Sequence, residues 1–229
     1  MTGFVNEKIS CVVPVYNEGK RVSGVLNALV GHHLIDEVIV VNDGSTDDSE
    51  RVLRGWSGIK LISYKPNKGK SHAMMTGIKE ARNDLILTID SDLVGLTRED
   101  VMALIEPVVS GKADVSMTLR KNSLAIFKYF GLDFVSGERV FDRRTIPDLH
   151  ELGKLTCFGL ESYLNNLIIK NKARLKVVYW KNVITPRKAV KFGYREGTKR
   201  DWKMVMEIVK YLGVKGVYRQ FRAMLKLKV

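Results

Sequence analysis

The chain has 229 residues and a mass of 25.9 kDa; 45% of its residues are hydrophobic and 28% are charged. This composition predicts a soluble globular protein with its own core and excludes a disordered or collagen-like chain. The longest uncharged stretch of the apolar N-terminal half, residues 22–35, falls short of the roughly 18 to 20 residues of a membrane span. Asn6, Glu7 and Lys8 stand where a secretory signal has its apolar segment, so we expect a cytoplasmic protein.

The net charge of +13 is concentrated at the C-terminal end. Residues 170–229 hold 18 lysines and arginines against three acidic residues, whereas residues 1–169 have a net charge of −2. Such a basic segment indicates an anionic partner: lipid head groups, nucleic acid or a phosphorylated substrate.

The two cysteines lie in apolar surroundings, and neither has a second cysteine or a histidine at metal-ligand spacing. We therefore expect Cys11 and Cys157 to be buried free thiols rather than a disulfide or metal ligands.

Short apolar runs rich in β-branched residues alternate with segments of helical periodicity. We expect strands at Ile9–Val15, Glu37–Val41, Ile59–Tyr64, Leu85–Ile89, Ala113–Leu119 and Leu175–Trp180. We expect helices at residues 22–30, from 46–49 onward, at 69–82, at 101–109 after a capping box at Thr97, and at 158–170. This alternation predicts an α/β domain with an open, mostly parallel sheet, in which ligands bind at the carboxyl ends of the strands.

The last part of the chain predicts two amphipathic helices. Their apolar stripes are Trp202, Val205, Met206, Val209 and Leu212, then Val214, Val217, Tyr218, Phe221 and Leu225. Together with the basic residues around them, these stripes are typical of helices that lie in a membrane interface, and packing against the α/β domain is the alternative. We therefore expect one domain at 1–197, with halves at 1–119 and 120–197, followed by basic helices at 198–229.

Polar residues follow four of the predicted strands. They are Tyr16, Asn17 and Glu18, then Asp43, then the run from Asn67 to Lys70, then Asp90 and Asp92. Because the carboxyl ends of parallel strands meet at one edge of a sheet, we expect these side chains to line one cleft.

Asp90-Ser91-Asp92 is the most specific of these sets. Aspartates two residues apart at a strand end can divide their roles, one toward a ribose hydroxyl and one toward Mg²⁺ or Mn²⁺. The alternative is a turn in which Asp90 caps the backbone and Asp92 lies in solvent.

Two of the other strand-end sets also have alternative interpretations. Asn42-Asp43-Gly44-Ser45 is ordinary turn chemistry, although its carboxylate could accept the ring N–H of a uracil-like base. Gly69-Lys70-Ser71 resembles the end of a nucleotide-binding P-loop, but Tyr64 occupies the position of the required first glycine. Lys70 at a helix N-terminus nevertheless suits a diphosphate.

The segments Val12 to Glu18, Val41 to Asp47, Asn67 to Lys70 and Asp90 to Asp92 resemble, in order and spacing, the motifs of family 2 glycosyltransferases with the GT-A fold. The resemblance is strong over residues 9–93. It continues more weakly through Ser136 to Arg139, Phe158 to Glu161 and the C-terminal helices, which resemble polyprenyl-phosphate-sugar synthases and their cytoplasmic relatives.

This resemblance implies a nucleotide-sugar site, with a divalent cation, Mn²⁺ or Mg²⁺, at Asp92. The implied donor-binding residues are Pro14, Tyr16, Asn17, Glu18, Asp43, Gly69, Lys70, Asp90 and Ser91. Ser136, Gly137, Arg139 and Glu161 would face the acceptor. The Glu-Asp pair of many relatives is absent, so Glu138 and Glu161 are the candidates for a catalytic base beside Asp92.

We therefore expect a metal-dependent enzyme that transfers a sugar from a UDP- or GDP-sugar. A polyprenyl phosphate at the inner membrane surface is the first expected acceptor, and a soluble sugar or phosphorylated compound is the second. A nucleotidyltransferase is a weaker alternative. The C-terminal aromatic residues fall on helical stripes rather than on a base-stacking surface, so we expect no nucleic-acid partner.

Overall fold

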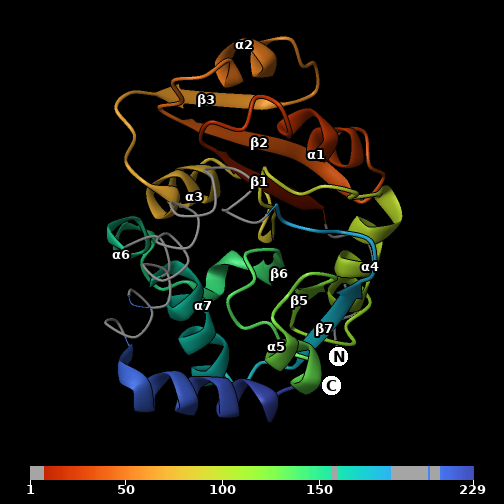
Figure 1. The fold of residues 1–229 in the computed structure, drawn as a ribbon, viewed down its shortest axis with the longest axis vertical. Helices are drawn as coiled ribbons and strands as arrows, with labels where there is room; N and C mark the ends of the chain where they lie inside the picture. The colour runs from red at the N-terminus through yellow and green to blue at the C-terminus, as the bar shows by residue number, and fades with distance from the viewer. Residues whose placement is uncertain (1–7, 156–158, 187–205, 207–211) are drawn as a thin grey trace.

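The computed structural model describes residues 8–155, 159–186, 206 and 212–229 (Figure 1). A seven-stranded sheet has the order β3-β2-β1-β4-β6-β5-β7. Its strands are β1 (Ile9–Val15), β2 (Ile35–Asp43), β3 (Lys60–Tyr64), β4 (Leu85–Thr88), β5 (Val115–Arg120), β6 (Arg139–Asp142) and β7 (Leu175–Trp180). The helices are α1 (Val22–Leu29), α2 (Ser49–Arg54), α3 (Lys70–Lys79), α4 (Arg98–Val109), α5 (Ala125–Phe130), α6 (Leu149–Lys154) and α7 (Gly159–Lys170), with a short 3-10 turn at Arg143–Thr145 and a further helix at 212–225.

The structure confirms the predicted open, mostly parallel sheet and all six predicted strands. The additional strand, β6, runs antiparallel between β4 and β5. The sequence pattern did not predict it because only Val140 and Phe141 of its four residues are apolar, too few to show a period.

Helices cover both faces of the sheet, as predicted (Figure 1). Val13 and Val15 of β1 pack in one cluster with α1 and α4, whereas Val12 packs in a second cluster with α3 and α7. Apolar residues on both sides of a strand are what a central parallel strand requires. The predicted capping box begins α4: Thr97 accepts a hydrogen bond from the Asp100 N–H at 3.2 Å, and the Asp100 carboxylate accepts one from the Thr97 N–H at 3.1 Å.

Only part of the apolar stripe predicted for the C-terminal helix packs against the core. Val217, Phe221 and Leu225 pack against the second core cluster, which is the expected alternative of packing against the α/β domain. Val214 and Tyr218 are exposed. Most of the stripe that begins at Trp202 lies outside the described residues, and so does Cys157; Cys11 is buried with a free thiol. Within the described part of the chain, no helix has the length and apolar character to cross a membrane.

Helix α3 packs directly on β1 because a glycine faces the strand. A Cβ at Gly77 would lie 2.3 Å from Cγ1 of Val12, too close for any side chain without movement. This close approach fixes the position of α3 and hence of Lys70 at its first turn.

We predict that Gly77→Ala lowers the free energy of unfolding by about 1–3 kcal/mol, because the added methyl group overpacks the contact between α3 and β1. Gly24→Ala in α1 is the matched control, since nothing lies within 4 Å of a Cβ there. That control should raise stability by about 0.4–1 kcal/mol through the unfolded state. Urea unfolding of both variants would measure the difference, and equal effects would contradict the packing argument.

Candidate functional site

The loops after β1 and β2 are held together by Asn17. Its backbone lies in the left-handed region at φ 55°, which asparagine tolerates better than most residues. The Asn17 Oδ1 accepts a hydrogen bond from the Thr46 N–H at 2.8 Å, and the Asn17 N–H donates to Ser45 Oγ at 3.0 Å. Tyr16 beside it is about half exposed. The loops that follow β1 and β2 therefore come together, through Ser45 and Thr46.

Asp43 is buried at the end of β2, where its carboxylate holds the loop that leads into α3. It accepts hydrogen bonds from the N–H groups of Lys68 at 2.8 Å and Gly69 at 2.9 Å, and from Asn67 Nδ2 at 2.8 Å. Gly44, at φ 67°, allows the approach, because a Cβ there would lie 2.5 Å from the Asn67 nitrogen. These contacts are with a loop 24–26 positions away, so they are structural but not the local turn chemistry of the alternative. Contact with a nucleotide base stays a prediction.

Lys70 is the centre of the candidate site. Its Nζ lies 2.8 Å from Oδ1 of Asp90 at the end of β4 and 3.0 Å from Oε1 of Glu161 on α7. Burial alone would lower the pKa of Lys70, but the two carboxylates outweigh burial and raise it above its usual value. A Cβ at Gly137 would lie 2.8 Å from the Lys70 Nζ and 3.0 Å from the Asp90 carboxylate oxygens, so a side chain there would displace this ion pair.

Glu161 is buried in the first turn of α7, where the helix dipole favours a carboxylate. One of its oxygens pairs with Lys70, and the other, Oε2, has no hydrogen-bond partner among the described residues. A buried acceptor without a donor costs about 1–3 kcal/mol. The dipole explains the position of Glu161 in the helix, but it does not explain the unpaired oxygen.

Glu138 is fully buried. Its carboxylate accepts hydrogen bonds from Arg120 Nη1 at 2.9 Å, Thr118 Oγ1 at 2.7 Å and Ser136 Oγ at 2.6 Å. Burial would lower the pKa of Arg120, but Glu138 and Asp133 outweigh burial and raise it. With three donors in place, Glu138 and Ser136 support the Gly137 loop; catalytic or acceptor roles for them stay predictions.

Arg139 is also buried, and it donates to the carbonyl oxygens of Ser136 and Phe134 and to Oδ1 of Asn165. Burial lowers the pKa of Arg139 to about 10, so the group is still a cation at neutral pH. Contact with an acceptor stays a prediction for this residue.

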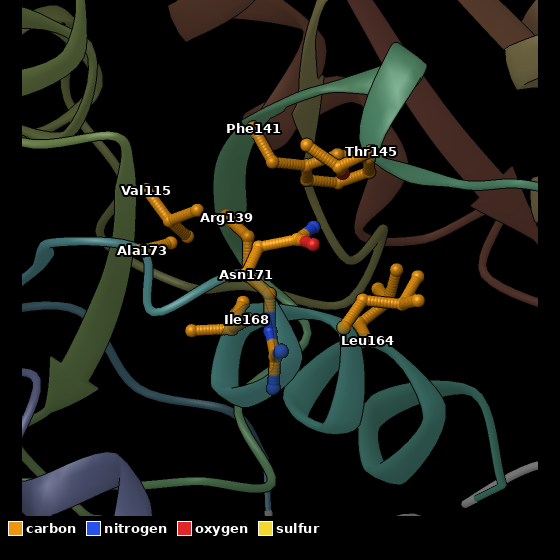
Figure 2. A pocket seen from close by; sticks show the side chains of 9 residues that line it. Val115, Arg139, Phe141, Thr145, Leu164, Ile168, Asn171 and Ala173 are labelled. Carbon is orange, nitrogen blue, oxygen red and sulfur yellow. The ribbon is translucent and has the colours of Figure 1, made fainter.

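A cavity beside Arg139 is too small for a substrate. Figure 2 shows the Arg139 side chain running alongside Ile168 of α7, within a lining that is mostly apolar. The cavity volume is about 20 Å³, which has room for one water molecule at most. This cavity is therefore not a substrate site.

Asp90 and Asp92 are the residues that could hold a divalent cation. Both are partly exposed, with buried Ser91 between them. The described residues contain no group of three or more histidines, cysteines or carboxylates placed to hold a metal. Two carboxylates fit Mg²⁺ or Mn²⁺, because such ions take oxygen ligands and complete their shell with water and substrate phosphate oxygens.

Sequence reasoning missed Arg120 and Asn165. Arg120 is the last residue of β5, so the strand-end rule that selected Asp43 and Asp90 would also have selected it. Asn165 had no such signal, because a polar residue within an apolar helical stripe can equally face solvent.

A sequence model described as "Glycosyl transferase family 2" matches residues 10–163. A 4,4'-diaponeurosporenoate glycosyltransferase from Staphylococcus aureus (strain bovine RF122 / ET3-1) is 32% identical over 106 residues. That match covers 44% of this chain and 28% of the relative, so the chain spans only part of that protein's length.

Two similar solved structures are of glucosyl-3-phosphoglycerate synthase from Mycobacterium tuberculosis. One, in complex with Mn²⁺, UDP and glucosyl-3-phosphoglycerate, has a TM-score of 0.72 at 20% identity. The other, with Mn²⁺, UDP-glucose and glycerol 3-phosphate, has a TM-score of 0.70 at 21% identity. Each comparison covers 93% of this chain and 82% of the other, and at these identities the similarity is one of fold.

We predict that Asp43→Ala lowers the free energy of unfolding by about 1–3 kcal/mol, because the N–H groups of Lys68 and Gly69 lose their acceptor. Asp48→Ala is the control in the same turn region, because its carboxylate forms only an exposed ion pair with Arg51. The control should change stability by less than about 0.5 kcal/mol. Comparable losses in urea unfolding would show that the Asp43 contacts do not hold the loop.

Proposed function

The chain belongs to glycosyl transferase family 2, and from that premise we propose that it transfers a sugar from a nucleoside-diphosphate sugar to a phosphate-bearing acceptor. One observation carries the proposal: Lys70 joins Asp90 and Glu161 at the carboxyl edge of the sheet. In this proposal the Lys70 cation faces the diphosphate, with Asp90 on the donor side and Glu161 on the acceptor side.

The donor would lie over the ends of β1, β2 and α3. The exposed Tyr16 ring offers a surface on which a base can stack, and Pro14, Asn17, Glu18 and Asp43 would enclose the base and ribose. The N–H groups at the start of α3 and the Lys70 ammonium would hold the diphosphate. At Gly69, no neighbouring atom of the described residues lies within 4 Å of where a Cβ would stand, so the backbone there offers space for a ligand.

Asp92, with Asp90 and Ser91 beside it, would hold Mn²⁺ or Mg²⁺ against the diphosphate. The cation would neutralise the negative charge that develops on the leaving nucleoside diphosphate. Lys70 contributes to the same neutralisation from the protein, and its two ion pairs keep it protonated and in place.

The acceptor would approach from the side of Gly137 and Glu161. The unpaired Oε2 of Glu161 could accept a proton or a hydrogen bond from an incoming hydroxyl. A phosphate nucleophile is already anionic and needs no base. We propose a polyprenyl phosphate at a membrane surface, in keeping with the basic residues of the predicted 198–229 segment.

A soluble phosphorylated acceptor is the second candidate. The mycobacterial synthase, which shares this fold, was solved with glycerol 3-phosphate in one complex and glucosyl-3-phosphoglycerate in another.

The experiment that tests the donor is a thermal-shift screen of UDP-, GDP- and dTDP-sugars, each with and without Mn²⁺. A ligand that binds the folded state raises the melting temperature, by an amount that grows with its concentration over Kd. We expect sugars of one base to stabilise the protein, and to do so more with Mn²⁺. If no nucleotide sugar stabilises it under either condition, the proposed donor site is wrong.

We predict that Asp92→Asn removes the Mn²⁺-dependent part of that thermal shift and the sugar transfer, while the unliganded protein stays folded. The neutral amide is a much weaker ligand for a hard cation than a carboxylate. Asp48→Asn is the control, because this change removes the same charge from an exposed carboxylate that pairs with Arg51. Metal-dependent stabilisation that persists in Asp92→Asn would remove Asp92 from the metal site.

Glu161→Gln distinguishes the two kinds of acceptor. If a hydroxyl is the nucleophile, we expect transfer to fall by about 100- to 10,000-fold, the usual contribution of a general base. Donor affinity, measured by calorimetry, should change much less. Glu151→Gln on the exposed part of α6 is the control. Transfer within a few-fold of the natural enzyme would exclude Glu161 as the base and favour a phosphate nucleophile.

A further inference from the structure

Helix α5 carries an exposed apolar surface. None of its residues is buried. Leu124 just before it is 59% exposed, and Ile126, Tyr129 and Phe130 are 56%, 84% and 41% exposed. We call these four residues the α5 patch. Exposed apolar side chains are ordinary when scattered, but four within seven residues form a contiguous surface that suggests a partner.

The α5 patch is continuous with the C-terminal helix at 212–225. The rings of Phe130 and Phe221 lie 5.4 Å apart, and Lys228 Nζ donates a hydrogen bond to the Phe130 carbonyl at 3.1 Å. Figure 1 shows α5 beside the end of the terminal helix. Val214 and Tyr218 on that helix are exposed as well.

The residues around this surface are basic. Segments 121–130 and 212–229 contain no aspartate or glutamate. They contain seven exposed basic residues: Lys121, Lys128, Lys215, Arg219, Arg222, Lys226 and Lys228. A surface of this composition matches an anionic layer with an apolar interior beneath it, because both kinds of side chain then find a complementary environment.

We propose that the α5 patch and the basic face of helix 212–225 dock on a lipid bilayer with anionic head groups. Ile126, Tyr129 and Phe130 would enter the boundary between head groups and acyl chains, where aromatic rings are favoured. The lysines and arginines would contact the phosphates. An acidic protein could match the charges, but the water-exposed apolar side chains of so short a helix fit a shallow insertion better than a second folded surface.

The position of the patch in the chain connects it with the site. Ser123, just before α5, donates a hydrogen bond to Asp133 at 2.6 Å, and Arg120 contacts both Asp133 and Glu138. Docking would therefore hold the acceptor side of the site, through the Gly137 loop, close to the bilayer. This step rests on the proposed function, whereas the docking itself does not.

The test is flotation of the full-length protein with vesicles of phosphatidylcholine alone or of equimolar phosphatidylcholine and phosphatidylglycerol. We expect binding to the anionic vesicles, release in 1 M salt where the Debye length is about 3 Å, and little binding to neutral vesicles. Ile126→Ser combined with Tyr129→Ser should reduce anionic binding at least tenfold. Met102→Ser on α4, a similarly exposed apolar position in the opposite helix layer, should leave it unchanged.

A second pair of variants tests the charges. Arg219→Gln combined with Lys226→Gln should weaken binding to anionic vesicles at least tenfold, whereas Arg51→Gln combined with Arg54→Gln, which removes the same charge from α2, should not. Equal effects of the two pairs would overturn the proposal. Unchanged binding in the Ile126/Tyr129 variant would overturn the proposal. Sedimentation gives a second outcome that would overturn it. If the natural protein is a dimer and the Ile126/Tyr129 variant is a monomer, the patch joins two copies of the chain instead of docking on a bilayer.

The same preparations, tested with nucleotide sugars, separate this inference from the proposed function. Donor binding without vesicle binding would overturn only the docking surface, and vesicle binding without donor binding would overturn only the enzymatic role.

Discussion

The two ion pairs of Lys70 are the interaction on which the candidate site depends. Its ammonium group brings together carboxylates from the segment after β4 and from α7, 20 and 91 positions away in the sequence. Without that cation, Asp90 and the buried Glu161 would face each other as like charges, and a buried carboxylate without a counter-ion is costly. The cation therefore permits the Asp90 and Glu161 carboxylates to occupy one small region.

Three residues elsewhere in the fold help to fix the position of Lys70. Gly77 allows α3 to pack on β1, Asp43 holds the loop that enters α3, and Gly137 leaves room beside the Lys70 Nζ. None of the three needs to contact a substrate in order to matter, because each fixes where Lys70 lies. A site of this kind is positioned by packing and hydrogen bonds in layers around it.

A second set of buried charges lies beneath Lys70. Arg120 pairs with Glu138 and Asp133, while Arg139 donates to backbone carbonyls and to Asn165. Asn165 in turn donates to Gln220 of the terminal helix at 3.1 Å. This network connects the Gly137 loop with the elements that carry the proposed docking surface, so the site and that surface belong to one hydrogen-bonded unit.

The sequence by itself determined the fold class, six of the seven strands and the four polar sets at the strand ends. Apolar periodicity and the polar residues that follow a strand can both be recognised within a short segment of sequence. It also determined the family resemblance, which lies mainly in residues 9–93. The strand β6 and the burial of Glu138 and Arg139 were decided by tertiary structure, since a four-residue strand has no readable period and a charged residue gives no local sign of burial. The pairing of Lys70 with Glu161 was likewise decided only there, because it depends on where the fold brings α7 relative to α3, and no sequence spacing encodes that contact.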